Sequence, residues 1–582
     1  MTKNALFVSM LVICFLSSSA LAANYYLSPL GNDSFSGTSP GQAWSTLQHV
    51  RAVGIAAGDT VFIMGGTYAG YQYFHDGSGT IFGTRNNPIV FKAYGDSQAV
   101  FTLTGHPTDP RYFLFYHRNN DYIIIDGYGH LPPYNQYSLK LEGHEHSGAL
   151  IQFGSSSLGD PVNYIEGIVI KGVEIDGAHH DLVDCAIMLR HIRKSVIEDN
   201  YIHHIHKPTG NILPGDNTER IQSTGYGIYL QSCELTLIQG NRIERCNHGS
   251  IYLEIVRGVS LPSGHPSRYN KVVNNVIENH YGGGIFLVIN PHHNLVEGNI
   301  IMHCGETTDF SKPGVQLSGS NNVLRKNIIY NPSNQALVME AQSVIGYHNI
   351  ADNNLIYNNT IFGSWYSFGM MVKNWSSESC SAERNTIANN IFYKSNGTIL
   401  DSNGRQPEIV CNLYDANNLH NWCDPDQNGC LPTGTNWGWN RYYNNCIRRN
   451  NEGSNYNRLI IWARDASYGG GWNDYSLVLA ESTSPVAWAN NIGADPMITS
   501  ESPDAFGMIN GWWYLKEGSP CVDAGAPIND IIGAYVESLY PGYGWANMPY
   551  TGAAPDIGAN EFNGESNPVF PAPRIRLSPN NR

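Results

Sequence analysis

Charge is scarce in this chain. Only 14% of its 582 residues are Asp, Glu, Lys or Arg, and the formal net charge is −15. A nucleic-acid partner requires clustered Lys and Arg to neutralise phosphates, so this charge balance disfavours one. Beyond the first 22 residues, no apolar run is long enough to span a membrane. A helical spacing of apolar residues is also missing from the central region, which argues against stacked helix pairs.

The sequence is rich in residues that suit β-structure. It contains 42% hydrophobic residues, which is ample for a core, together with 60 Gly, 35 Tyr and 12 Trp. This composition fits a β-rich protein that faces a glycan.

The first 22 residues have the features of an export signal. They combine Lys3, an apolar run from Ala5 to Leu16, and small residues at Ala20 and Ala22. This pattern is typical of a secretory signal that is cleaved. We therefore expect a secreted protein, extracellular or periplasmic, with no membrane insertion after cleavage.

One short pattern occurs seven times between Ser195 and Tyr393. Its centre is an Asn, with an aliphatic residue three positions before it and an apolar residue two positions after it. The seven are Asn200, Asn241, Asn275, Asn299, Asn327, Asn359 and Asn390. Their spacing varies from 24 residues (299 − 275) to 41 residues (241 − 200). A repeat with variable insertions indicates coils whose strands are constant and whose loops differ in length.

The repeated Asn is expected in the turn between two short strands. Asn tolerates the left-handed backbone region, and its amide can hydrogen-bond along a stack of identical amides. Because a single coil cannot bury its apolar face, the coils must stack. The repeats therefore predict a parallel β-helix.

A second strand follows the Asn in each coil. In GIYLQS from Gly227, SIYLEI from Ser250 and GIFLVI from Gly284, the period-2 rule sends the Ile and Leu side chains into the core. The outer face of the same strands, with that of the neighbouring coils, is expected to carry Met188, Arg190, Tyr229, Gln231, Tyr252, Glu254, Phe286, Val288, Gln316, Ser318, Val338, Glu340, Met371 and Lys373. An exposed sheet that carries Tyr, Gln, Glu and Arg is unusual for a merely solvated surface, so we take it as the candidate ligand face.

Both ends of the chain carry further recognisable segments. Residues 25–68 include a stretch from Trp44 to Val53 that can form a short amphipathic cap helix, followed by a first strand from Thr60 to Met64. Near the other end lie SPCVDAG from Ser519 and APDIGANEF from Ala554. With the repeats, these segments resemble secreted right-handed parallel β-helix proteins of the pectate-lyase-like superfamily.

The resemblance implies an all-β fold, a right-handed parallel β-helix solenoid with an N-terminal cap helix and a C-terminal extension rich in Cys, Asn and Trp. It also implies an extended ligand, a polysaccharide, bound along the outer face of one sheet. The superfamily includes polysaccharide lyases, glycoside hydrolases, epimerases, esterases and phage tailspikes, so the fold alone does not choose an activity.

The expected organisation divides the chain into six parts. They are a signal peptide (1–22), a cap and first coil (23–86), the β-helix (87–394), a loop-rich insertion (395–496), C-terminal closing coils (497–564) and a loose tail (565–582). Disulfides are the default expectation for the cysteines of the insertion and its surroundings, Cys380, Cys411, Cys423, Cys430 and Cys446. Cys246 and Cys304 lie two coils apart, roughly 9–10 Å, and are expected to be buried thiols.

The candidate catalytic residues come from the outer face and from the turns that precede its strands. They are Glu254, His248, Tyr252, Arg190 and Asp184. Stacked coils are expected to bring neighbours among them within about 5 Å and the outermost within about 10 Å. The candidate substrate-binding residues are Tyr229, Gln231, Arg257, Phe286 and His204.

These residues leave three functions open. In a lyase that acts on a uronate, Arg190 would neutralise the carboxylate, and His248 and Tyr252 would serve as base and acid in either order. In a glycoside hydrolase, Glu254 and Asp184 would be the two carboxyl groups. In a non-catalytic glycan-binding or surface protein, Glu254 and Arg190 would form a surface ion pair, and the Tyr side chains would form a stacking ladder.

Two stretches could hold a metal ion. The hexapeptide DPDQNG from Asp424 matches the opening of a calcium loop, with Asp424, Asp426 and Asn428 as ligands of Ca²⁺. The twelfth position is Thr435 rather than an acid, so an ordinary Asx-turn loop is the alternative. His203, His204 and His206 form an HHxH cluster with no nearby Cys, which is more typical of a solvated or substrate-lining loop than of a metal site.

Overall fold

A computed structural model places most of the chain between residues 22 and 559. The described residues are 22–70, 72–76, 82–103, 115–117, 122–129, 137–143, 148–154, 164–177, 183–205, 225–255, 266–278, 282–305, 312–330, 335–344, 347–348, 350–362, 369–375, 382, 384–393, 409–414, 440–448, 460–463, 472–475, 488–498, 515–528, 550 and 552–559. Within these ranges, no helix has both the length and the apolar character needed to cross a membrane.

Several predictions concern residues outside these ranges. They are the signal peptide, the loose tail, Arg257, His206, Cys380, Cys423, Cys430, and the calcium-loop residues Asp424, Asp426 and Asn428.

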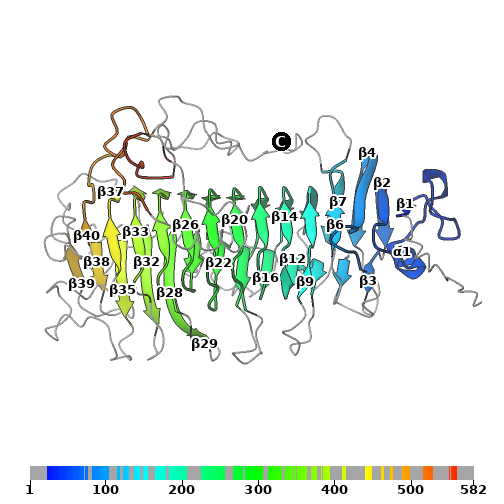
Figure 1. The fold of residues 1–582 in the computed structure, drawn as a ribbon, viewed down its shortest axis with the longest axis horizontal. Helices are drawn as coiled ribbons and strands as arrows, with labels where there is room; N and C mark the ends of the chain where they lie inside the picture. Colours follow the sequence, from blue (N-terminus) through cyan, green and yellow to red (C-terminus); the bar gives the residue numbers. More distant parts are fainter. Residues whose placement is uncertain are drawn as a thin grey trace, which may run out of the picture.

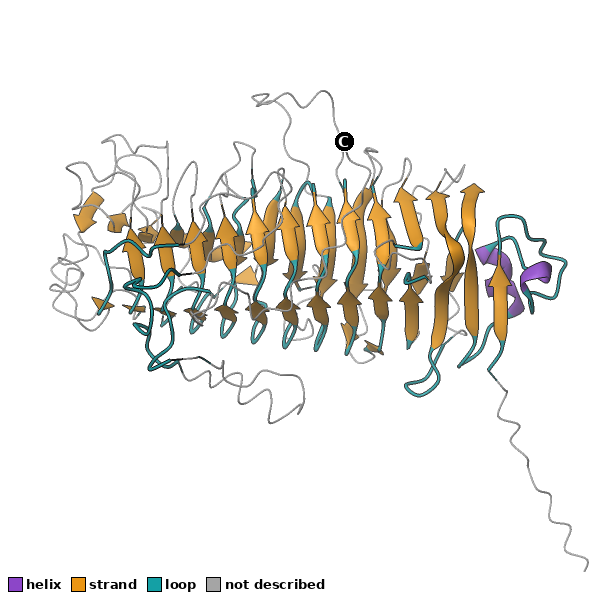
Figure 2. Cartoon of the chain, turned by 90° about the horizontal axis from the view of Figure 1, so that it is seen from above, coloured by secondary structure: helices purple, strands orange, loops and turns teal. Residues whose placement is uncertain are grey.

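The chain winds into a right-handed parallel β-helix, as predicted. Each coil adds two short strands to a 24-stranded sheet, the first sheet, and one strand to a 14-stranded sheet, the second sheet. One coil, for example, contains β14 (Val196–Glu198), β15 (Tyr201–His203) and β16 (Tyr226–Gln231). Figures 1 and 2 show the strands stacked in rows along the long axis of the molecule.

The strands of the first sheet are β1 (Asn24–Leu27), β2 (Thr60–Gly70), β4 (Ile89–Leu103), β6 (Ile123–Asp126), β7 (Leu139–Gly143), β10 (Val169–Lys171), β11 (Val173–Asp176), β14, β15, β17 (Leu237–Gln239), β18 (Arg242–Glu244), β20 (Lys271–Val273), β21 (Val276–Glu278), β23 (Leu295–Glu297), β24 (Ile300–Met302), β26 (Val323–Arg325), β27 (Ile328–Tyr330), β30 (Leu355–Tyr357), β31 (Thr360–Phe362), β33 (Thr386–Ala388), β34 (Ile391–Tyr393), β36 (Arg441–Tyr443), β37 (Cys446–Arg448) and β40 (Trp488–Ala489).

The strands of the second sheet are β3 (Phe74–Asp76), β5 (Phe115–His117), β8 (Gly148–Phe153), β12 (Val183–Arg190), β16, β19 (Gly249–Glu254), β22 (Gly283–Leu287), β25 (Val315–Leu317), β28 (Leu337–Val344), β29 (Tyr347–His348), β32 (Met370–Trp375), β35 (Ile409–Tyr414), β38 (Ile460–Ala463) and β39 (Trp472–Tyr475). Two further strands, β9 (Ile165–Glu166) and β13 (Ile192–Arg193), pair with each other.

A short helix lies at the N-terminal end of the solenoid (Figure 1). Helix α1 (Leu47–Val53) follows a 3₁₀ turn, η1 (Pro40–Gln42). The hydroxyl of Thr46 caps the helix by accepting a hydrogen bond from the His49 amide, so the helix starts three residues later than the predicted Trp44. Trp44, Leu47 and Val50 are buried, as the amphipathic pattern predicted.

The repeated Asn side chains form a continuous ladder inside the coils. The amide oxygen of each accepts hydrogen bonds from both the backbone N–H and the side-chain NH₂ of the Asn one coil earlier; Asn275, for example, donates to Asn299 at 3.0 and 2.9 Å. Asn445 and Asn491 extend the ladder past the seven predicted members.

The prediction that each repeated Asn has the left-handed backbone conformation is wrong by one position. The left-handed residue is the one before each ladder Asn, such as Asp199, Gly240 or Asn274. The ladder Asn itself is the buried residue that follows this bend, and its side chain points into the stack.

A second Asn ladder, which the sequence analysis missed, precedes the first strand of each coil. It consists of Asn270, Asn294, Asn322, Asn354, Asn385 and Asn440, each of which donates to the next. The two ladders bond the coils to one another at two corners.

The core follows the predicted alternation in the second sheet. Ile228, Leu230, Ile251 and Leu253 are fully buried inside the coils. A Cβ built on Gly227 would meet side chains of Ile243 and Cys246, so this glycine also points inward and interrupts the alternation. This irregularity turns Tyr226, the residue before it, toward the outer face.

The solenoid continues beyond Tyr393. Strands β35 to β38 and β40 each pair in parallel with a strand of the preceding coil, so the segment predicted as a loop-rich insertion contributes to both sheets. Cys446 begins β37 as a buried cysteine in the thiol form, which corrects its predicted disulfide. Cys446 belongs to the apolar cluster on the flank of the last coils, and its thiol donates to the carbonyl of Ala494.

Cys246 and Cys304 are buried thiols, as expected. Burial, together with the neighbouring Cys304, raises the pKa of the Cys246 thiol well above its ordinary value. The Cys246 thiol is therefore an uncharged packing group at neutral pH.

The C-terminal segments lie along the flank of the last coils (Figure 1, orange and red). Three Asn side chains on the outside of successive coils, Asn358, Asn389 and Asn444, donate to the carbonyls of Asp556, Ala526 and Ala524. The buried Ile557 and Cys521 share an apolar cluster with Ile391 and Tyr393. Residues 515–528 and 552–559 thus pack against the side of the solenoid.

Candidate functional site

The outer face of the second sheet brings residues from successive coils into register, as predicted. Arg190 pairs with Gln231, which pairs with Glu254. The adjacent outward column consists of Met188, Tyr229, Tyr252, Phe286, Gln316 and Val338. This register supports the assumption that like positions of consecutive coils stack.

The face is not the exposed strip that the sequence analysis expected. Tyr229, Tyr252, Phe286 and Gln231 are each less than 10% exposed, and Glu254 is fully buried. Arg190 and His248 retain intermediate exposure. Strand alternation identifies the side of the sheet that a residue faces, but burial depends on what packs over that side. Among the candidate catalytic residues whose side chains are described, Arg190 and His248 are therefore the accessible ones.

An aromatic cluster surrounds His248, which lies just before β19 as predicted. The His248 ring lies 4.7 Å from the ring of Tyr226, 5.4 Å from that of Tyr252 and 6.2 Å from that of Phe286. Tyr226 also stacks on Tyr229 at 4.5 Å. Ring packing of this kind fixes the orientation of the imidazole.

Lys312 is a site residue that the sequence analysis missed. Its ammonium lies 2.8 Å from Nδ1 of His248, and its side chain is only 3% exposed. His248, Gly282 and Lys312 each lie three residues before the paired residues Ile251, Ile285 and Val315, so they form one column across three coils. Lys312 therefore reaches His248 across the coil that contains Gly282.

The Lys312 contact assigns a proton to His248. A charged ammonium can only donate a hydrogen bond, so Nδ1 of His248 accepts and the proton of the neutral imidazole is on Nε2. The imidazole therefore presents an Nε2–H donor in a site lined by Tyr226, Tyr252 and Phe286.

A separate polar group lies near Arg190. Nε of Arg190 donates to Oε1 of Gln231 at 2.6 Å, and the Gln231 amide donates to the Tyr229 hydroxyl at 2.6 Å. These contacts hold the guanidinium at the edge of the face, where its remaining N–H groups can bind an anion.

The predicted convergence of all five catalytic candidates is wrong. His248 and Glu254 are six residues apart along one strand, which at about 3.3 Å per residue separates them by roughly 15–20 Å. The prediction considered the distance between coils and neglected the distance along the strand. The His248 group and the Arg190 group therefore lie at opposite ends of the face.

The backbone positions of Asp184 and Glu254 also lie far apart along the strand direction. Asp184 is within β12 rather than in the preceding turn, six residues before Arg190, which is in register with Glu254. Inverting glycosidases separate their carboxyl groups by about 6.5–9.5 Å. An offset of six residues along the strand, at about 3.3 Å per residue, places the two backbone positions roughly 15–20 Å apart, which exceeds that separation.

His204 lies at the corner between the two sheets. It follows β15, and the next residue, Ile205, accepts a backbone hydrogen bond from Asn247 at 3.0 Å. Asn247 is adjacent to His248, so His204 borders the His248 end of the face.

The comparisons with known proteins agree with this fold. A family described as "Right handed beta helix region" matches residues 217–378. No curated protein matches the sequence.

Solved structures of similar shape include three lyases. Pectate lyase Pel9A is 13% identical, with 93% of this chain and 96% of that chain covered and a TM-score of 0.39. A rhamnogalacturonan lyase is 14% identical, with 63% and 87% covered and a TM-score of 0.36. The PL6 family alginate lyase AlyGC is 13% identical, with 87% and 61% covered and a TM-score of 0.36.

Proposed function

We propose that this protein is a secreted carbohydrate-active enzyme that cleaves an acidic polysaccharide by β-elimination at the outer face of the second sheet. The observation that carries the proposal is the His248–Lys312 pair, at 2.8 Å, beside the rings of Tyr226 and Tyr252. The predicted export signal supports an extracellular or periplasmic location.

In the proposed reaction, the acid and the base both lie at the His248 end of the face, and Arg190 at the other end binds substrate. Elimination from a uronate requires a base for the proton alpha to the carboxylate and an acid for the leaving oxygen. The Tyr252 side chain, as the phenolate, takes the alpha proton and becomes the phenol. The Nε2–H of His248 protonates the leaving oxygen while Nδ1 takes a proton from the Lys312 ammonium, so the imidazole stays neutral, and exchange with solvent returns the proton from Tyr252 to Lys312. Lys312 orients His248 and adds positive potential for the substrate carboxylate.

Arg190 is suited to a more distant sugar unit. At roughly 15–20 Å from His248, its guanidinium would bind the carboxylate of a sugar several units away in the same polysaccharide. An extended polymer with repeated carboxylates fits two such cationic positions on one face.

The test is digestion of a panel of uronate polysaccharides with detection of both unsaturated products, by ultraviolet absorbance, and reducing ends. We expect both signals from the wild type. His248→Asn should lower the rate by about 10²-fold or more. His303→Asn, at a half-buried histidine of the first sheet, is the matched control and should retain the rate.

Three outcomes would contradict the proposal. Reducing ends without ultraviolet absorbance would indicate a glycoside hydrolase. Binding without any cleavage would indicate a glycan-binding protein. If the protein neither binds nor cleaves any of the polysaccharides, the face has no polysaccharide ligand in the panel.

A further inference from the structure

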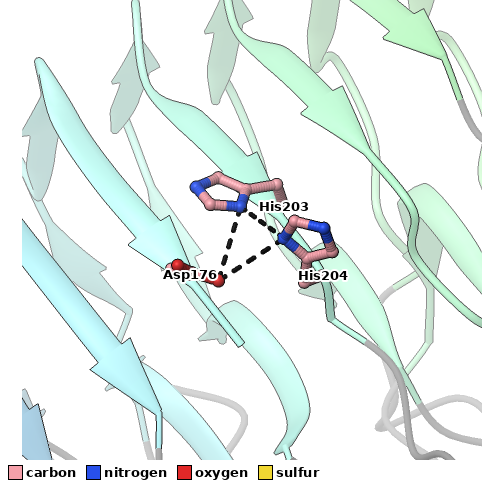
Figure 3. Close-up of side chains that lie close together, drawn as sticks. All are labelled: Asp176, His203 and His204. Carbon is pink, nitrogen blue, oxygen red and sulfur yellow. Dashed lines mark hydrogen bonds and ion pairs between the residues drawn. The ribbon is translucent and has the colours of Figure 1, made fainter. Parts of the chain in front are cut away.

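The end of β15 brings three potential metal ligands together on the first sheet (Figure 3). Nδ1 of His203 lies 3.4 Å from Oδ1 of Asp176, and Nδ1 of His204 lies 3.5 Å from the same oxygen. The two Nδ1 atoms are 2.7 Å apart. Asp176 comes from β11, one coil before the two histidines.

The local backbone explains why two neighbouring histidines point to one place. His203 ends β15 with its side chain on the outer face, and His204 has a left-handed backbone with φ of 56°. That bend turns the second ring back toward the first. The register then places Asp176 directly beside His203.

Surrounding groups support the ligands in the manner of a metal site. Nε2 of His203 lies 3.4 Å from a carboxylate oxygen of Glu174, and the Tyr201 ring stacks on the His203 ring at 4.2 Å. A carboxylate behind a ligating histidine fixes its tautomer, so that the other ring nitrogen is free to bind a metal. The second oxygen of Asp176 accepts from Lys140 at 2.9 Å, which leaves Oδ1 directed at the histidines.

The local charge favours a cation. The described residues on the outer faces of β7, β11, β15, β18 and β21, and in the turn after β18, include five carboxylates and three basic groups. They are Glu142, Glu174, Asp176, Glu244 and Glu278, against Lys140, Arg242 and Arg245.

We propose that Asp176, His203 and His204 form a binding site for one divalent transition-metal ion of the Zn²⁺ class. Two imidazole nitrogens and one carboxylate oxygen are a donor set that Zn²⁺ accepts, with water as the fourth ligand. Bonds of about 2.0–2.1 Å in a tetrahedron separate ligand atoms by roughly 3.3 Å, close to the two histidine–aspartate distances. Binding requires the two Nδ1 atoms to move apart by about half an ångström. It also requires the exposed Arg245, whose Nη1 lies 3.0 Å from Nε2 of His204, to turn away.

A second histidine pair provides an internal control. His292 and His293 repeat the same local geometry, with Nδ1 atoms 2.8 Å apart and a left-handed second residue. Their neighbour on the adjacent coil is Arg268 rather than an acid. Among the described residues, only Asp176, His203 and His204 bring three ligand atoms together.

The experiment titrates Zn²⁺ into the full chain, freed of any affinity tag and of metal by chelation, and follows binding by calorimetry. The expected result is about one ion per chain, with affinity at least about 10-fold weaker in Asp176→Asn and in His204→Asn and unchanged in His293→Asn. Asn tolerates the left-handed backbone of His204 and His293, so both variants should fold. Circular dichroism of the metal-free variants checks this directly.

The proposal is overturned if the wild type takes up no Zn²⁺ at micromolar concentration. It is also overturned if the first two variants bind as tightly as the wild type while retaining its spectrum, or if His293→Asn loses as much affinity as His204→Asn.

Discussion

At the scale of single residues, the ladder Asn side chains satisfy backbone groups that no strand pairing reaches. The Asn299 amide donates to the carbonyl of Val272 at 2.8 Å and to Oδ1 of Asn327 at 2.9 Å. Its oxygen accepts from the backbone and side chain of Asn275. Since Asn299 is fully buried, water cannot replace these bonds.

Asn299→Ala should therefore lower the free energy of unfolding by about 2–4 kcal/mol, because it leaves at least one buried donor and one buried acceptor without partners. Urea unfolding followed by fluorescence measures the change. Asn274→Gly is the control, since Gly240 and Gly298 occupy the same left-handed position in the coils on either side. A loss below about 1 kcal/mol for Asn299→Ala, or equal losses for the two variants, would contradict this account of the ladder.

His292 should make stability depend on pH. Burial, with the neighbouring charges of His293 and Arg268, lowers the pKa of His292 to about 4. The unfolded chain, with a histidine pKa near 6.5, binds a proton at a higher pH than the folded chain does. Stability from this residue is therefore complete above about pH 6.5 and is lost as the pH falls toward about 4.

The expected loss over that range is about 2–3 kcal/mol. Titrating carboxylates change stability in the same range, so the measurement is the difference between the wild type and His292→Asn in urea midpoints at pH 7, 5.5 and 4.5. The urea midpoint of the wild type should fall relative to that of His292→Asn as the pH falls, because only the wild type loses the contribution of His292. A gap that is constant with pH would show that His292 has an ordinary pKa.

At the scale of elements, the C-terminal segments are held on the last coils mainly by side-chain contacts, together with one backbone hydrogen bond from Gly558 to Asn389. Ile557 is fully buried in the cluster with Ile391 and Tyr393. Ile557→Ala should cost about 2–4 kcal/mol of docking free energy. The coils themselves should remain folded, since their ladders do not include this residue.

Hydrogen exchange with mass spectrometry tests this prediction. Amides of residues 515–528 and 552–559 should exchange faster in Ile557→Ala, while those of β20 to β27 should be unchanged. Tyr550→Ala, at a residue 43% exposed, is the control and should leave the segments protected. Faster exchange throughout the coils would mean that the segments are part of the cooperative solenoid.

The sequence predicted those elements whose pattern is the same in every coil. The first Asn ladder was visible because one residue type recurs with apolar neighbours at constant offsets. The second ladder starts at Asn270. The positions in register with Asn270 in the two preceding coils are Ser195 and Thr236, and this change of residue type conceals the ladder.

The candidate site was only partly predictable for a related reason. Stacking of Arg190, Gln231 and Glu254 follows from register alone. The His248–Lys312 contact skips a coil through Gly282, and no periodic pattern indicates a contact between next-nearest coils. Burial of the face depends on packing over it, which strand alternation does not encode.

At the scale of the whole molecule, each coil of the solenoid contacts mainly the coils on either side. Stability in such an array is a sum of terms for single coils and for neighbouring pairs, so a defect weakens the array according to its position. Asn299 lies near the middle of the first ladder, whereas Asn445 is bonded to Asn491 at its C-terminal end.

Asn299→Ala and Asn445→Ala remove equivalent buried amides. The two variants should nevertheless differ in how far along the solenoid hydrogen exchange becomes faster. In Asn445→Ala, faster hydrogen exchange should be confined to β36, β37, β40 and the C-terminal segments that pack on them. In Asn299→Ala, it should extend from β21 to β27 on both sides of the defect, because both neighbouring coils lose a partner. Identical exchange along the whole solenoid in the two variants would show that the array unfolds as one cooperative unit, and the additive description of its coils would then be wrong.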